Sequence, residues 1–229
     1  MSSHYNNNNN DIEKNNARPQ HIERRASGRG YAPPAIASPA PLGLFSFAST
    51  TLILSLFNAQ ARGISEPNAV VGMALFCGGL AQLLAGMWEF PKGNTFGATA
   101  FTSYGAFWLS WGIMHIPASG IRAAYADETM YLNAVGIYLI TWTLVTFFFM
   151  IAALRKTNAF VVLFGLLTIT FALLAGGDLA QNINATKAGG IFGVLTALVA
   201  YYIGLSDMLA NEAAPVVRLP VGAYVARMA

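Results

Sequence analysis

Two long stretches without a charged residue constrain this chain more than any other feature of its sequence. No Asp, Glu, Lys or Arg occurs between Lys92 and Arg122, or between Glu128 and Arg155. Only 10% of the 229 residues are charged and 55% are hydrophobic, whereas a soluble domain carries about 25% charged residues. A helix needs about 20 predominantly apolar residues to cross the hydrocarbon core of a bilayer. The sequence therefore predicts an integral membrane protein.

Apolar runs separated by charge, proline or glycine predict an all-α fold with six transmembrane helices. Only helices and closed barrels satisfy the backbone hydrogen bonds in lipid, and these runs are too long and too irregular for strands. The expected spans cover about residues 42–60, 67–89, 95–116, 130–154, 158–175 and 188–209. The expected connections are 61–66, 90–94, 117–129, 155–157 and 176–187.

The two ends of the chain differ in composition from the predicted membrane domain, which covers residues 38–211. Residues 1–37 are rich in Asn and other polar residues, a composition typical of disorder, and they lack the apolar core of a signal peptide. Within them, Arg24, Arg25 and Ser27 resemble a kinase site. Residues 212–229 form a second, short tail.

The positions of Lys and Arg predict the orientation of the domain. With six spans both tails share one side, which would hold ten of the 13 Lys and Arg residues, although the loops alone divide three against three. Positive charge collects on the cytosolic side. We therefore expect cytosolic tails and a multi-pass protein of the plasma membrane, with an organelle membrane as the alternative.

Small residues recur every four positions in two of the predicted spans. They are Ala74, Gly78 and Gly86, in register with Gln82, and Gly189, Gly193 and Ala197. Such stripes let membrane helices approach closely. The spacing fits either packing within one protomer or an interface between subunits.

Several predicted spans carry neutral hydrogen-bonding side chains but no Lys or Arg and no acid at mid-depth. Candidates on helical faces include Thr51, Gln82, Tyr104 and Thr168. An ionised group stripped of water is penalised by tens of kcal/mol in idealised estimates, and a neutral polar group by only a few. A path lined in this way suits small neutral solutes or a weak acid in its protonated form. The alternative is an anion that travels with a proton held on Glu89 or Asp178.

An enzyme is not expected. The three histidines, His4, His21 and His115, are isolated, and Cys77 is a lone cysteine. No nucleophile–base pair and no metal-ligand spacing occurs, so we predict no catalytic residue, no metal and no cofactor.

Two strings of residues point to a known family. SPAPLGL at 38–44 and KGNTFGATAFTSYGAFW at 92–108, together with AQLLAGMWEF at 81–90 and FALLAGGD at 171–178, resemble the acetate uptake transporter family. That family includes bacterial succinate–acetate permeases and fungal acetate and ammonia-export proteins. The resemblance implies six helices, proton-coupled acetate transport and a hexamer in the membrane. One position differs, because the family signature opens with Asn-Pro where this chain has Ser38, another residue able to cap a helix.

The resemblance also implies a hydrophobic constriction formed by Phe47, Tyr104 and Leu167. Thr50, Thr51, Gln82 and Thr168 are the candidate contacts of the substrate carboxyl group, and Glu89 and Asp178 are the candidate proton-coupling residues. The expected partners are acetate or a similar small carboxylate, protons, membrane lipid and further copies of the chain, with no nucleic acid. The alternatives are a channel or exporter for another small solute such as ammonia, and a membrane sensor that transports nothing.

Overall fold

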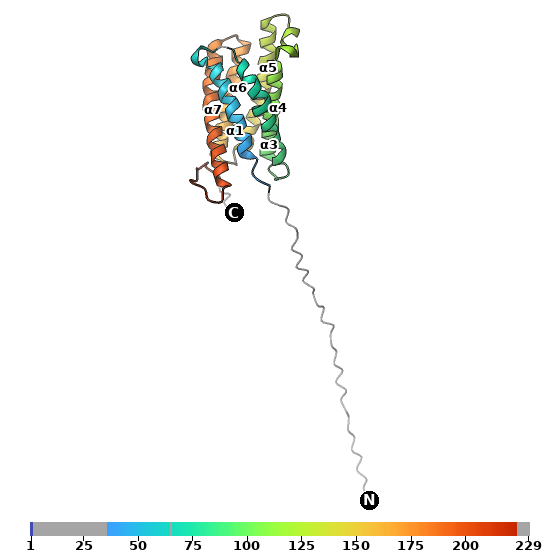
Figure 1. Ribbon diagram of the computed structural model, residues 1–229, viewed down its shortest axis with the longest axis vertical. Coiled ribbons are helices and arrows are strands. Elements are labelled where there is room, and N and C mark those ends of the chain that lie inside the picture. Colours follow the sequence, from blue (N-terminus) through green and yellow to red (C-terminus); the bar gives the residue numbers. More distant parts are fainter. Residues whose placement is uncertain (2–35, 65, 224–229) are drawn as a thin grey trace. The chain divides into compact units, whose positions relative to one another are not determined.

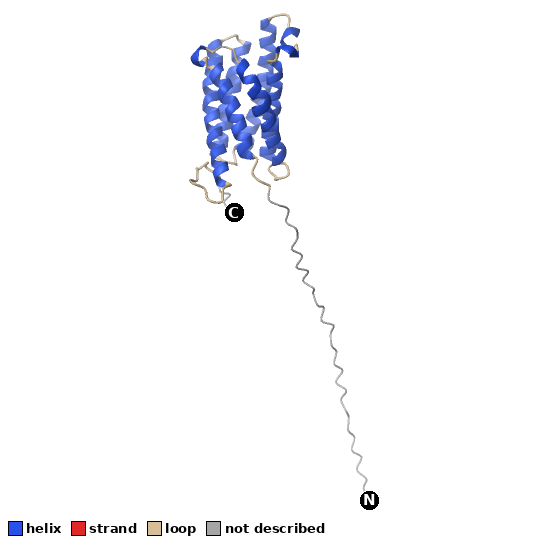
Figure 2. Cartoon of the chain, viewed as in Figure 1, coloured by secondary structure: helices blue, strands red, loops and turns tan. Residues whose placement is uncertain are grey.

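Six long helices form a bundle in the computed structural model, which describes Met1, residues 36–64 and residues 66–223 (Figure 1). Regular secondary structure in these residues is helical (Figure 2), which confirms the predicted all-α class. One isolated antiparallel bridge joins Thr157 to Ala223. Most of the tail that was predicted to be disordered, residues 1–37, lies outside the described residues. The predicted kinase site at Ser27 also lies outside them.

The six spans follow one another up and down through the bundle. In chain order they are α1 (Ala40–Asn58), a composite span (Asn68–Glu89), α4 (Thr95–Met114), α5 (Glu128–Ala153), α6 (Asn158–Leu179) and α7 (Ile183–Ala210). All but α4 are both long enough and apolar enough to cross a membrane. Helix α4 has the length and no charge, but its hydroxyls and glycines make it less apolar.

The composite span is irregular in its middle. A short turn η2 (Asn68–Val70) leads into α2 (Val71–Leu75), a wide π-helical turn η3 (Phe76–Ala81) and α3 (Gln82–Glu89). In η3, a Cβ atom on Gly78 would lie 2.8 Å from both Thr50 Oγ1 and the Trp108 ring. The glycine therefore allows α1 and α4 to close on this turn, and π-helical turns of this kind are frequent at functional sites.

The predicted connection 176–187 is wrong, because almost all of it is helical. Helix α6 continues to Leu179 and α7 begins at Ile183, so that residues 180–182 alone join them. The side chain of Asn182 caps α7. The absence of a Cβ on Gly177 allows Thr186 of α7 to approach. Polar and glycine residues that suggested a loop thus lie within two packed helices, and Asp178 is a helical residue.

The small-residue stripes pack within the protomer. A Cβ on Gly86 would lie 2.5 Å from the backbone nitrogen of Thr102 in α4. Likewise, Gly189 and Gly193 of α7 lie against Leu174 and Ser55, respectively. For these glycines the packing interpretation is confirmed.

Helices α4 and α5 are joined by side chains. Tyr104 and Thr146 share a hydrogen bond of 2.9 Å between their hydroxyls, and the hydroxyls of Ser110 and Tyr138 share one of 2.8 Å. Aromatic rings fill the space between the two helices, as in the stacked pair Phe107–Tyr138. Hydrogen bonds and stacked rings thus link the two helices.

The segment 219–223 folds back onto the bundle. The backbone nitrogens of Asn158 and Ala159 donate to the carbonyls of Gly222 at 2.9 Å and Val221 at 3.1 Å. The hydroxyls of Tyr202 and Ser206 in α7 donate to further carbonyls of the segment. Because the first N–H groups of a helix have no partner within it, this segment completes the start of α6.

Candidate functional site

Two cavities lie in the bundle, each with a volume of about 180 Å³. We name them after one polar residue in each. The Asp178 cavity also contains Thr51, Trp108 and His115 in its walls. The Gln82 cavity lies towards the end of the bundle at which α1 begins, and its walls include Asn94. Both are large enough for a few water molecules or a small organic acid.

The three residues expected to form a constriction each line at least one of the two cavities. Phe47 lines both cavities, Tyr104 lines the Gln82 cavity and Leu167 lines the Asp178 cavity. All three side chains are buried, and the rings of Phe47 and Tyr104 are 5.6 Å apart between centroids. We call these three residues the collar.

Tyr104 is fixed by its neighbours in α5 and α6. Besides the hydrogen bond to Thr146, its ring stacks on Phe164 at 6.3 Å and contacts Trp142 at 5.8 Å. A buried aromatic ring with a satisfied hydroxyl and several aromatic contacts has few alternative rotamers. The collar therefore has a rigid side on α4.

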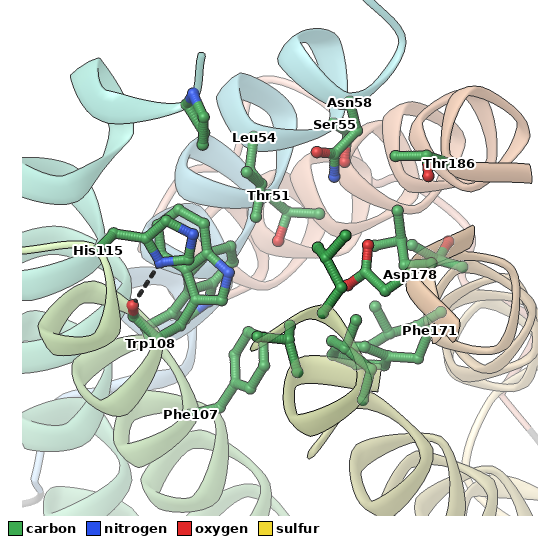
Figure 3. Close-up of a pocket in the computed structure, with 18 of the residues that line it drawn as sticks. Thr51, Leu54, Ser55, Asn58, Phe107, Trp108, His115, Phe171, Asp178 and Thr186 are labelled. Atoms are coloured by element: carbon green, nitrogen blue, oxygen red, sulfur yellow. Dashed lines mark hydrogen bonds between the residues drawn. The ribbon is translucent and has the colours of Figure 1, made fainter. Parts of the chain in front are cut away.

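The Asp178 cavity combines aromatic walls with isolated polar groups (Figure 3). Its polar side chains are Thr51, Ser55, Asn58, His115, Tyr131, Thr170, Asp178 and Thr186. Thr51 Oγ1 and Trp108 Nε1 are buried, and neither has a hydrogen-bond partner among the described residues. Both residues line this cavity.

The Gln82 cavity is more apolar. Gln82 is 1% exposed, and its Oε1 has no partner among the described residues. Asn94 caps α4 by accepting a hydrogen bond from the backbone nitrogen of Gly97 at 3.1 Å. Its Nδ2 donates to Glu89 Oε2 at 2.8 Å. Lys156 and Tyr104 supply further polar groups.

Glu89 lies behind Asn94 and does not itself line the cavity. It is 0% exposed, and its second carboxyl oxygen, Oε1, has no partner among the described residues. A buried carboxyl oxygen without a partner is costly unless a proton, a water molecule or a solute satisfies it. The hydrogen bond from Asn94 thus connects the carboxyl group of Glu89 to the wall of the cavity.

Two of the expected substrate contacts do not line either cavity. The hydroxyl of Thr50 donates to the carbonyl of Ser46 at 3.0 Å, and that of Thr168 to the carbonyl of Phe164 at 2.7 Å. Each hydroxyl is therefore satisfied by its own helix, which is common for Ser and Thr in membrane helices. Thr51 and Gln82 do line the cavities, one on each side of the collar.

The sequence interpretation missed several residues that line the cavities, among them Asn94, Trp108, Lys156 and Thr170. The spacing of Trp108 offered a signal, since it follows Tyr104 by four residues and so shares its helical face. Thr170 could not be separated from Thr168 without knowing the rotation of α6. Lys156 was assigned to a loop, and only the folded chain brings that loop beside a cavity.

Ser38 does not cap α1. The N-cap position is Pro39, which has no side-chain capping hydrogen bond. Ser38 Oγ donates instead to Asp207 Oδ2 at 2.9 Å and accepts from Lys92 Nζ at 2.8 Å. Ser38 thus connects the loop ahead of α4 to the last turn of α7.

Comparisons with known proteins identify relatives of the whole membrane domain. The profile described as GPR1/FUN34/yaaH family matches residues 26–222. "Ammonia transport outward protein 2" of Saccharomyces cerevisiae is 49% identical over 177 residues, which are 76% of this chain and 63% of the relative. "Acetate permease A" of Emericella nidulans is 45% identical over 183 residues, 75% of this chain and 61% of the relative. This chain thus spans less than two thirds of the length of these two fungal proteins.

One solved structure has the same fold. It is described as the structure of the bacterial acetate channel SatP, and it superposes with a TM-score of 0.72 at 36% sequence identity. The match covers 82% of this chain and 100% of that chain. The likeness therefore extends over the whole of the solved chain.

Proposed function

Because the chain belongs to the GPR1/FUN34/yaaH family, we propose that it takes up acetate and similar small monocarboxylates across the plasma membrane. The observation that carries this proposal is the pair of cavities on the two sides of the collar. A compact acid with one methyl group can occupy either cavity, and the collar is the narrow apolar step between them.

The chemistry of the collar favours a solute that crosses without charge. An apolar constriction excludes hydrated ions by dewetting, and an ionised carboxylate loses far more hydration energy there than a neutral acid. A carboxylic acid titrates near pH ~4, so an acidic medium supplies the neutral form. We therefore propose that a proton accompanies each acetate.

Two carboxyl groups could hold that proton. Asp178 lies in the wall of one cavity and Glu89 lies behind Asn94 at the other. They are therefore on opposite sides of the collar. The proposal assigns them to proton exchange on their own sides.

Ammonia or ammonium is the second candidate solute. The observation that favours it is the pair of unpartnered acceptor oxygens, Gln82 Oε1 and Glu89 Oε1, because an ammonium ion can only donate hydrogen bonds. The name of the yeast relative that is 49% identical points the same way.

We also propose that the protein is a hexamer with both ends of the chain in the cytosol. The basic residues Lys92, Arg155, Lys156 and Arg218 lie in the connections before α4 and α6 and in the segment after α7. Hydrogen bonds join these segments to the start of α1 and to the segment after α7, so they share one end of the bundle. Large apolar side chains such as Phe76, Trp88 and Phe148 are exposed on the outside. Lipid or neighbouring subunits would cover them.

Purified protein in proteoliposomes tests the proposal. Radiolabelled acetate uptake is measured with an imposed pH gradient, with and without protein, because acetic acid also crosses lipid unaided. We expect saturable uptake that rises when the donor side is acidified. Methylammonium flux in the same vesicles tests the second candidate. Absence of protein-dependent flux for both solutes would favour the sensor alternative.

A further inference from the structure

Thr51 is one of two threonines in the transmembrane helices, with Thr102, whose buried hydroxyl has no hydrogen-bond partner among the described residues, and of these two only Thr51 lines a cavity described above. Most of the other threonine hydroxyls in these helices donate to the backbone carbonyl four residues earlier, as in Thr50, Thr99, Thr141, Thr143, Thr168, Thr170 and Thr196. Thr51 is 5% exposed, and its hydroxyl has no partner among the described residues. Its hydrogen-bonding capacity is therefore left for something in the Asp178 cavity.

Trp108 brings a second unsatisfied group to the same cavity. It is 3% exposed, and its indole Nε1 has no partner among the described residues. The indole N–H is a donor only, and buried tryptophans usually place it against an acceptor. Gly78 is required beside this ring, since a Cβ there would lie 2.8 Å from two of its atoms. The ring is thus held in place while its polar atom is not satisfied.

We propose that Thr51 and Trp108 together bind the carboxyl group of the substrate in the Asp178 cavity, and so select carboxylic acids over ammonium. This inference rests on the proposed function. Figure 3 shows both side chains along this cavity. They come from α1 and α4, the two helices that also supply Phe47 and Tyr104 of the collar.

The hydrogen-bonding capacities of the pair match a carboxyl group. A carboxylate offers two acceptor oxygens to the two donors. In the neutral acid, the carbonyl oxygen accepts from the indole N–H, and the acid hydroxyl exchanges a hydrogen bond with the threonine, which can donate or accept. An ammonium ion has no lone pair and cannot accept from the indole.

The remaining wall favours a small apolar tail. Leu54, Leu139, Leu167 and Phe171 line the same cavity as the pair. A methyl group can therefore lie against the aliphatic wall while the carboxyl group meets the two donors. In this arrangement the acid is bound next to the collar.

The test removes each polar atom with little change of shape. Trp108→Phe keeps an aromatic ring and loses the N–H, and Thr51→Val keeps the branched shape and loses the hydroxyl. The matched controls are Trp88→Phe, on an exposed ring, and Thr196→Val, whose buried hydroxyl bonds to its own helix. Acetate and methylammonium fluxes are measured for each variant in proteoliposomes, after gel filtration has confirmed the wild-type assembly.

We expect each cavity variant to raise the half-saturation concentration of acetate by about 5- to 20-fold, the loss of one hydrogen bond to a polar or charged group. Methylammonium flux and both controls should stay at wild-type values. An unchanged half-saturation for acetate, or an equal loss of both fluxes, overturns the inference. If wild-type protein carries no acetate, the proposed function itself fails, which is a separate result.

Discussion

The rings of Phe47 and Tyr104 lie 5.6 Å apart, and Phe47 lines both cavities of the bundle. Under the proposed function, a solute that passes from one cavity to the other moves past this aromatic pair. Tyr104 is also held by its hydrogen bond to Thr146, so we expect the tyrosine to determine the width of the proposed constriction.

Tyr104→Ala should widen the collar and weaken discrimination by size. One methylene is worth about 10- to 200-fold in a tight apolar site, so we expect butyrate uptake to rise at least about tenfold relative to acetate uptake. Competition between the two acids in proteoliposomes measures the ratio.

Tyr104→Phe is the control for that experiment. It keeps the ring and removes the hydrogen bond to Thr146, which contributes about 1 kcal/mol to folding. We expect a lower melting temperature and an unchanged ratio of butyrate to acetate uptake. An unchanged ratio in Tyr104→Ala as well would show that the collar does not select by size.

Glu89→Gln should weaken the dependence of acetate uptake on pH. The amide can still accept the hydrogen bond from Asn94, so the fold is preserved, but it cannot take up a proton. Coupling to one proton changes uptake by at most about tenfold per pH unit, and we expect at least half of this slope to be lost. Uptake rates at a series of external pH values measure the slope.

Glu212→Gln is the matched control for Glu89, since Glu212 is exposed near the end of α7. Its pH profile should overlay that of the wild type. Asp178→Asn tests the other proposed proton site in the same assay. If Glu89→Gln keeps the full slope, the buried carboxyl only holds Asn94 and the start of α4 in place.

The membrane spans were predictable because charge and hydropathy determine which segments can enter lipid. The helix ends were less predictable. At 176–187, Gly177 and Asn182 look like loop residues in the sequence, but they serve helix contact and helix capping. Local composition cannot distinguish these uses from a turn, since they depend on the facing helix.

The candidate site was predictable only in part. Phe47, Tyr104 and Leu167 could be named from the resemblance to a family. Thr50 and Thr51 are adjacent, and only the rotation of α1 decides that Thr51 lines a cavity while Thr50 bonds within its own helix. Residues brought in by tertiary packing, such as Lys156, carry no such signal in the sequence.

Gly86→Ala should separate α3 from α4. The added Cβ would lie 2.5 Å from the backbone nitrogen and 3.0 Å from the Cα of Thr102, and a backbone cannot rotate away as a side chain can. Overpacking of this kind costs about 1–3 kcal/mol. We expect a clear drop in melting temperature in detergent.

Gly176→Ala is the opposite case in α6. It is an exposed glycine, and a Cβ there meets nothing within 4 Å. Alanine is favoured over glycine in a helix by up to about 1 kcal/mol, so this variant should be as stable as the wild type or more so. A similar destabilisation in both variants would contradict the packing described for Gly86.

The segment 219–223 should contribute to stability through Gly222. This residue has a φ of +67°, and a Cβ there would lie 2.9 Å from the Cβ of Asn158 at the start of α6. Gly222→Ala should therefore lower the free energy of unfolding in two ways. The left-handed backbone conformation costs about 1–2 kcal/mol with a Cβ present, and the Cβ clashes with Asn158. The clash also disturbs the hydrogen bonds that complete the first turn of α6.

Gly120→Ala separates these two effects. Gly120 has a similar φ of +70°, but a Cβ there meets nothing within 4 Å, so this variant suffers the backbone penalty alone. In detergent, the melting temperature should be highest for the wild type, lower for Gly120→Ala and lowest for Gly222→Ala. Equal melting temperatures for the two variants would mean that the contact between segment 219–223 and α6 adds nothing to the stability of the bundle.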